Sequence, residues 1–236
     1  MKKKILMIGD TSDLYGVSVD IRSYYDFFTS PVGGNWHHNE IETLRSPSRR
    51  LLFKKLDEIE RADYDYVITI FSGHGKESIS GTILVINGNA DTIDAADLAN
   101  LSPRQLSIFD CCRSFTAMPA DTQGTVLSMS YDPIRKAYEQ KIQDSPPQGI
   151  YLFACCEGET AKDSDVGGRY SVYLLSAVRM MLTVSCSPFI SVDDVHYKAE
   201  MLMSQAETIT PQNPEMLCSR RSTRRCLPLA VNPHYL

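Results

Sequence analysis

The sequence predicts one α/β domain, residues 1–236, in which a mostly parallel sheet lies between helices on both faces. Short apolar runs of strand type alternate along the chain with segments whose apolar residues recur at helical spacing. The chain has 236 residues, and the 43% that are hydrophobic are enough to form one large core. The sequence has no internal repeat and no low-complexity tract, so we expect a single domain.

The first half of the chain contains three predicted strands and two predicted helices. Residues 4–9 form an apolar strand, and residues 17–28 carry apolar side chains at helical spacing. The elements predicted next are a strand at 41–44, an amphipathic helix at 47–60 and a strand at 66–71.

The second half continues this alternation around one long connection. Residues 82–86 form a strand that ends at Asn87-Gly88, a strong hairpin signal. Residues 115–149 have little periodicity apart from a helical pattern at 131–142, and a connection of this length is expected to be mobile or functional. The other predicted elements are a helix near 94–101, strands at 106–109 and 150–154, a helix at 169–182, a helix capped by 191–194 that runs to about 207, and a short last strand at 225–231 in which Pro228 suits a sheet edge.

Composition and charge exclude several classes of function. The formal net charge is −5 and the basic residues stand in short scattered clusters, which argues against nucleic acid as a partner. No apolar run approaches the roughly 20 residues of a membrane span, and the run at 5–8 is too short for a signal peptide. The seven cysteines include two adjacent pairs without zinc-ligand spacing, so we expect free thiols in a reducing cytoplasm.

Two predicted strands end in residues with a clear chemical signal. The strand at 66–71 is followed by His74 between two glycines, and the strand at 106–109 is followed by Asp110, Cys111 and Cys112. Parallel strands bring their carboxyl ends to one edge of the sheet, where open α/β sheets bind their ligands. A thiol facing an imidazole there is the arrangement of a cysteine protease, in which the histidine accepts the proton of the nucleophile.

These segments resemble the caspase-like cysteine peptidases, and among them metacaspases and bacterial caspase-family proteins. Ser72-Gly73-His74-Gly75 matches the motif after the third strand of that fold, and Asp110, Cys112 and Ser114 match the motif after the fourth. Residues 150–161 resemble its fifth strand and the loop that follows. Arg113 and Phe115 replace the histidine and glycine that are usual in metacaspases, although caspases also have an arginine after the cysteine. The resemblance covers roughly residues 5–231 and implies a caspase-like three-layer sandwich, in which a mostly parallel six-stranded sheet has helices on both faces.

The resemblance selects Cys112 as the nucleophile rather than Cys111, because the nucleophile of the family stands two residues after the aspartate. Side chains alternate along a strand, so only one of the two cysteines faces His74. The backbone N–H groups of Gly75 and Cys112 are the expected donors to an oxyanion, since such a charge needs fixed dipoles aimed at it.

The resemblance also implies a substrate pocket for arginine or lysine. In metacaspases, positions that match Asp20, Ser72 and Asp110 line the pocket for the residue before the cut. Two carboxylates in one concave site suit a guanidinium, which offers several donors in a planar fork. We therefore expect protein or peptide substrates that are cut after arginine or lysine.

Some questions stay open at this level. Asp91, Asp94 and Asp97 do not have the spacing of a calcium loop, so we expect no metal or other cofactor, although many metacaspases respond to calcium. Self-cleavage is expected in the long connection, at Arg135 or Lys136. The alternative to a peptidase is a catalytically inactive module of the same fold that binds partners. The sequence gives no oligomeric state.

Overall fold

The computed structural model describes residues 1–79, 81–113, 133–206, 212–219 and 225–236. Phe115 and Ser114 lie outside these ranges, as do most of the long connection after Arg113 and the expected end of the last helix near residue 207.

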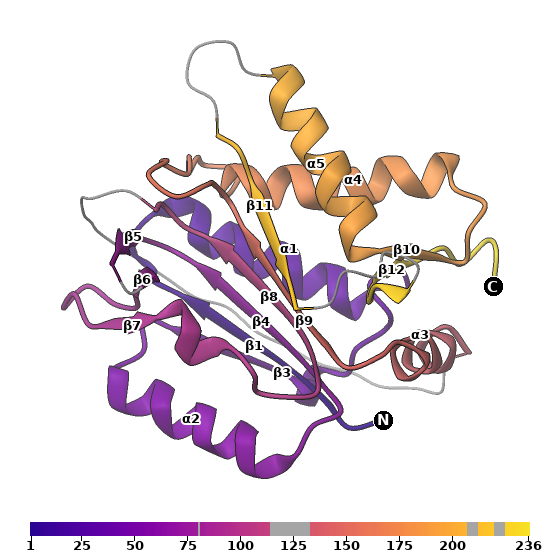
Figure 1. Cartoon of the computed structure of the whole chain (residues 1–236), viewed down its shortest axis with the longest axis horizontal. Helices are drawn as coiled ribbons and strands as arrows, with labels where there is room; N and C mark the ends of the chain where they lie inside the picture. The colour runs from indigo at the N-terminus through magenta and orange to yellow at the C-terminus, as the bar shows by residue number, and fades with distance from the viewer. Residues whose placement is uncertain (80, 114–132, 207–211, 220–224) are drawn as a thin grey trace.

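A six-stranded sheet forms the middle layer of the domain, and its parallel arrangement confirms the expected fold class (Figure 1). Its strands are β1 (Lys3–Gly9), β3 (Ile41–Arg45), β4 (Tyr66–Ser72), β8 (Arg104–Asp110), β9 (Gln148–Phe153) and β11 (Glu215–Cys218). They are ordered β11-β9-β8-β4-β1-β3, and every pairing is parallel except that of β11 with β9. β1, β4 and β8 are almost wholly buried because they read as continuous apolar runs, as expected for a sheet covered on both faces.

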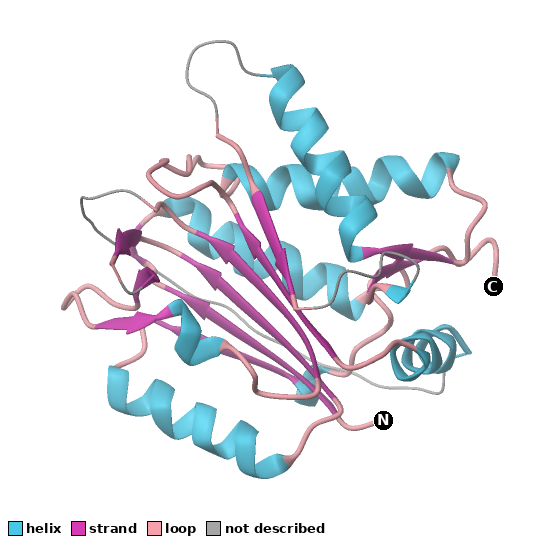
Figure 2. Cartoon of the chain, viewed as in Figure 1, coloured by secondary structure: helices cyan, strands magenta, loops and turns pink. Residues whose placement is uncertain are grey.

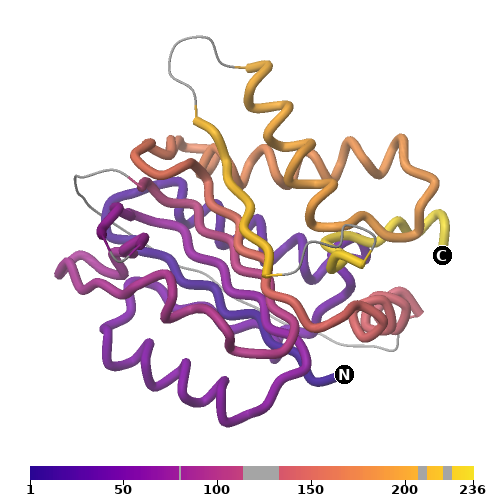
Figure 3. The backbone as a smooth tube through the Cα atoms, in the orientation of Figure 1, coloured from indigo at the N-terminus to yellow at the C-terminus, as the bar shows by residue number. Residues whose placement is uncertain are grey.

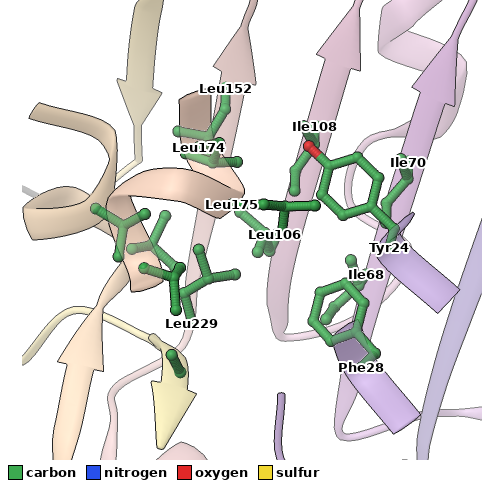
Figure 4. Close-up of a cluster of buried hydrophobic side chains, with 14 of the residues drawn as sticks. Tyr24, Phe28, Ile68, Ile70, Leu106, Ile108, Leu152, Leu174, Leu175 and Leu229 are labelled. Atoms are coloured by element: carbon green, nitrogen blue, oxygen red, sulfur yellow. The ribbon is translucent and has the colours of Figure 1, made fainter. Parts of the chain in front are cut away.

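Helices cover both faces of this sheet (Figure 2). They are α1 (Tyr15–Thr29), α2 (Arg49–Ala62), α3 (Pro133–Asp144), α4 (Arg169–Val184) and α5 (Val192–Ala206). One core cluster joins the sheet to α1, α3, α4 and α5, and Figure 4 shows Tyr24 and Phe28 of α1 against side chains of β4 and β8. The other cluster lies between the sheet and α2, with the apolar stripe Leu52, Leu56 and Ile59 facing inward.

The domain has smaller elements besides the central sheet, and several of them differ from the sequence prediction. Two small sheets are formed by β5 (Gly75–Ser78), β6 (Gly81–Val85) and β7 (Thr92–Asp94), and by β10 (Phe189–Ser191) with β12 (Pro228–Val231). The hairpin expected at Asn87-Gly88 is present as β6 and β7. The helix expected near 94–101 is only a 3₁₀ turn at Ala95–Leu98. The last predicted strand, β12, pairs with β10, so the edge position in the central sheet belongs to β11, which the sequence did not reveal.

The carboxyl ends of the parallel strands, the β5–β6 hairpin and the segment after β9 gather at one end of the sheet, at the upper left of Figure 3. This is the end at which His74 and Cys112 were expected. Within the described ranges, no helix combines the length and the apolar character needed to cross a membrane.

Candidate active site

The strand ends that carry His74 and Cys112 are in register. Ser72, the last residue of β4, pairs with Asp110, the last residue of β8, and the N–H of Gly73 donates to the carbonyl of Asp110 at 3.1 Å. His74 and Cys112 each stand two residues beyond this registered pair. The structure therefore brings the two expected catalytic segments to adjacent positions on the sheet edge.

The imidazole of His74 contacts a carboxylate that the sequence did not single out. Its Nε2 lies 2.9 Å from Oδ1 of Asp13, which belongs to the short strand β2 (Ser12–Asp13) after β1. The two side chains are only 14% and 5% exposed, so this contact is largely shielded from water. Partial burial raises the pKa of Asp13, and the nearby imidazole acts in the opposite direction.

Gly75 lies directly against the backbone of Cys112. A Cβ at this position would collide with the carbonyl oxygen of Cys112 and would stand 2.7 Å from Sγ of Cys111. Gly75 faces Leu84 in the β5–β6 hairpin at a non-hydrogen-bonded position, because the N–H of Val85 donates to the carbonyl of His74. The N–H of Gly75 therefore points away from β6, as a donor to an external oxyanion must.

The two adjacent cysteines have different surroundings. Cys111 is buried in the core cluster on the α2 side of the sheet, and burial raises the pKa of its thiol well above the usual range. Cys112 is partly exposed, and its thiol donates to the carbonyl oxygen of Ala161 at 3.3 Å. A thiol that must ionise and meet a substrate needs access to solvent, so the burial of the two residues favours Cys112.

The expected pocket residues Asp20, Ser72 and Asp110 do come together. The hydroxyl of Ser72 donates to Oδ2 of Asp20 at 2.7 Å. Both carboxylates accept from the first turn of α4: the N–H of Gly168 donates to Asp20 at 3.0 and 3.1 Å, and that of Ser171 to Asp110 at 2.7 Å.

The close approach of these carboxylates requires a glycine at the start of α4. A Cβ at Gly168 would stand 2.5 Å from Oδ2 of Asp110 and 2.9 Å from Oδ2 of Asp20. Burial raises the pKa of both carboxyl groups, and for Asp20 the charge of Asp110 adds to this effect. The helix N-terminus offsets part of the cost of holding two like charges together.

The segment that leads into α4 lies beside this carboxylate pair. Gly167 lies against Oδ1 of Asp20, and the exposed Asp163 accepts from the N–H of Gly16 at 3.2 Å. Asp20 and Asp110 are accordingly 1% and 6% exposed. Two surface hollows of about 240 and 310 Å³ lie elsewhere, beside α5 and beside the β10–β12 sheet.

Arg113, which departs from the metacaspase motif, anchors the segment that carries Cys112. Its side chain is 4% exposed and forms ion pairs with Glu77 at 3.1 Å, Glu157 at 3.1 Å and Glu215 at 2.6 Å. The guanidinium also lies 4.6 Å from the ring centroid of Phe153, and the backbone N–H of Arg113 donates to Glu159. One cation thus ties the residue after Cys112 to β5, β11 and the segment after β9.

The aspartates considered for calcium have local structural roles. Asp91 accepts from Asn87 at 3.0 Å and from the backbone of Arg49 at 3.3 Å, while Asp97 caps the turn that begins after Asp94. Among the described residues, no group of three or more His, Cys, Asp or Glu side chains is arranged to hold a metal ion.

Asp13, Glu77 and Glu215 are the residues at this site that sequence reasoning missed. Asp13 lies 61 positions before His74, in a strand of two residues with no periodic signal. Glu215 belongs to β11, which is too short and too mixed in character to be recognised. An arginine directly after a strand end, such as Arg113, indicates an anionic partner. It does not indicate which acidic residue that partner is.

Comparison with known proteins places these features in context. A sequence model of the family described as Caspase domain matches residues 2–224. The crystal structure of caspase-1 from Spodoptera frugiperda is similar to this one, with a TM-score of 0.61 over 92% of this chain and 86% of that chain. The sequence identity is 11%, so this likeness concerns the fold alone. No curated protein sequence gave a significant match.

Proposed function

Because residues 2–224 match its model, this chain belongs to the caspase domain family, and on that premise we propose that it is an endopeptidase that cuts after arginine or lysine. The family supports cysteine-type peptidase activity in general and therefore protein substrates. The observation that carries the catalytic part of the proposal is the pairing of Ser72 with Asp110, which sets a histidine and a partly exposed cysteine two residues beyond one register position.

In this mechanism Cys112 is the nucleophile and His74 the base. The thiol proton passes to His74 and the sulfur attacks the carbonyl carbon of the scissile bond. The N–H groups of Gly75 and Cys112 stabilise the resulting oxyanion. The carbon–nitrogen bond then breaks, and the amine leaves with the proton from His74. Water hydrolyses the thioester, giving one proton to His74, which returns it to the thiolate sulfur. No cofactor or metal is needed for these steps.

The specificity proposal rests on the buried carboxylates of Asp20 and Asp110. Two negative charges held together by burial are unfavourable without a cation, and a guanidinium would satisfy both through charge-assisted hydrogen bonds. Arginine is expected to be preferred to lysine, because its planar fork reaches two carboxylates at once.

The experiment compares hydrolysis of fluorogenic peptides that end in arginine, lysine or aspartate. We expect Asp20→Asn and Asp110→Asn each to lower kcat/KM for arginine peptides by about 100-fold, because losing one partner of a desolvated pair costs roughly 2–5 kcal/mol. The rate of thiol alkylation should change little in these variants. Asp26→Asn, on the exposed face of α1, is the control and should leave kcat/KM unchanged.

The outcomes separate the proposal from its alternatives. Efficient cleavage after aspartate, or unchanged arginine cleavage in the two pocket variants, would contradict the specificity. Tight binding of arginine peptides without hydrolysis by any preparation would favour the non-catalytic binding module. Measurements with and without calcium test the expectation that no metal takes part.

Two further proposals concern the cell and the maturation of the protein. The seven cysteines are all free thiols in the structure, which supports a reducing compartment such as the cytoplasm. Self-cleavage within the long connection is favoured at Lys136 rather than at Arg135. Lys136 is exposed on α3, whereas Arg135 is only 17% exposed and binds both carboxylate oxygens of Glu40 at 2.6 Å.

A further inference from the structure

We propose that Asp13 is a positioning residue for His74, so that the site works as a Cys112–His74–Asp13 triad rather than as a pair. This inference rests on the proposed function and deepens it. Its starting point is the 2.9 Å contact between Nε2 of His74 and Oδ1 of Asp13, in which the side chains are 14% and 5% exposed. A carboxylate in this position accepts the N–H of the ring and thereby fixes which nitrogen carries the proton.

The tautomer set by Asp13 is the one that the chemistry needs. With hydrogen on Nε2, the lone pair of Nδ1 is available to accept the proton of the Cys112 thiol. Once that proton is transferred, the ring is an imidazolium that faces a carboxylate, which stabilises it. Asp13 keeps its charge throughout and neither gains nor loses a proton.

The chain holds Asp13 in place through a network around the turn after β1. Asp10, directly after β1, accepts from the backbone N–H of Ser12 at 3.1 Å and from the side-chain hydroxyl of the same residue. The hydroxyl of Ser46 binds both Asp10 and the backbone of Thr11, at 3.3 and 3.0 Å. This turn therefore has a defined shape before it reaches Asp13.

The same turn is fastened to the strand that carries His74. The backbone N–H of Asp10 donates to the carbonyl of Ser72 at 3.1 Å, two residues before His74. The carboxylate and the imidazole are thus attached to one rigid edge, which is what a positioning residue requires, because small displacements of such a group lower the catalytic rate strongly. An acid that merely capped α1 would need no such link, and no side-chain cap bond is present at the start of that helix.

The test compares Asp13→Asn with Asp13→Ala. The amide of asparagine is isosteric with the carboxylate and can donate to Nε2, which would place the ring proton on Nδ1, opposite the thiol. Alanine imposes no tautomer. We therefore expect kcat to fall by about 100-fold or more in Asp13→Asn and by less in Asp13→Ala, with KM within about threefold of the parent in both.

A spectroscopic readout distinguishes this role from a structural one. In a Cys112→Ala background, the ¹⁵N resonances of His74, assigned by comparison with His74→Ala, should report hydrogen on Nε2 in the parent and on Nδ1 in Asp13→Asn. The inference is overturned if Asp13→Asn keeps more than half of the parent kcat, if only KM changes, or if the tautomer stays the same. Turnover that survives His74→Ala or Cys112→Ala would instead overturn the proposed function, whatever Asp13 does.

Discussion

Replacing Arg113 by lysine is expected to destabilise the folded domain by about 3 kcal/mol. The guanidinium is 4% exposed, and its carboxylate partners Glu77, Glu215 and Glu157 are 15%, 34% and 72% exposed. Breaking a buried pair costs about 3–5 kcal/mol because the remaining charge is left unsatisfied, whereas an exposed pair contributes less than about 1 kcal/mol. Lysine keeps the charge but binds only one carboxylate at a time. We therefore expect the cost of the substitution at the lower end of the range for a buried pair.

Urea unfolding of variants in a Cys112→Ala background measures this free energy without turnover. The single tryptophan, Trp36, is 2% exposed in the core and reports on unfolding by its fluorescence. The matched control is Glu157→Gln, which removes the exposed partner and should cost less than about 1 kcal/mol. A fall in the midpoint at constant m-value is a change in stability.

Two results would refute the assignment of Arg113 as a buried anchor. One is a fall of less than about 1 kcal/mol in the free energy of unfolding of Arg113→Lys. The attraction within the ion pairs would then do little more than balance the cost of removing the charges from water. The other is a Glu157→Gln variant as unstable as Arg113→Lys, because the exposed pair would then carry the energy that the structure assigns to Glu77 and Glu215.

Three other predictions concern the site and its connection. Cys112→Ala should abolish peptide hydrolysis, and Cys111→Ala should leave substantial activity in a folded protein. The reverse pattern would show that Cys111 is the nucleophile. Burial raises the pKa of Asp110 to about 6, so the folded protein binds this proton more tightly than the unfolded chain, and the contribution of Asp110 to stability is lost as pH rises from about 4 to 7. The free energy of unfolding in urea should therefore be the same for Asp110→Asn and the parent near pH 4. At pH 7.5 it should be greater for Asp110→Asn by on the order of 2 kcal/mol. A difference between the two proteins that does not change with pH would contradict this. Lys136→Ala should remove self-cleavage in the connection and Arg135→Ala should not, as read by intact mass; fragments that persist in Cys112→Ala would come from another protease.

Most of the central sheet could be predicted from the sequence, because its strands are buried on both faces and appear as uninterrupted apolar runs. β4 and β8 were expected within two residues of their observed bounds. β11 could not be predicted, since a four-residue edge strand is partly exposed and has no periodic signal. The helix expected near 94–101 is shorter than its apolar spacing indicates, because Asp94 and Asp97 close a single capped turn there.

The site residues, too, could be predicted only where they stand next to a recognisable strand or motif. His74 and Cys112 stand directly after recognisable strands, so the topology of a parallel sheet was enough to bring their segments together. Asp20 and Ser72 followed from the resemblance, and in the structure a 2.7 Å hydrogen bond joins them. Asp13 depends on the path of a turn after β1, and no local sequence pattern encodes which distant side chain that turn will face.

Covalent labelling with a peptidyl-arginine chloromethyl ketone, followed by peptide mapping, tests the nucleophile and the specificity in one measurement. The proposed function predicts a single adduct on Cys112, formed rapidly with the arginine reagent and slowly with its aspartate counterpart, and strongly retarded in His74→Ala. An adduct on Cys111 or Cys156 in place of Cys112, or equal labelling by the aspartate reagent, would contradict the proposal that this protein cuts after basic residues through Cys112.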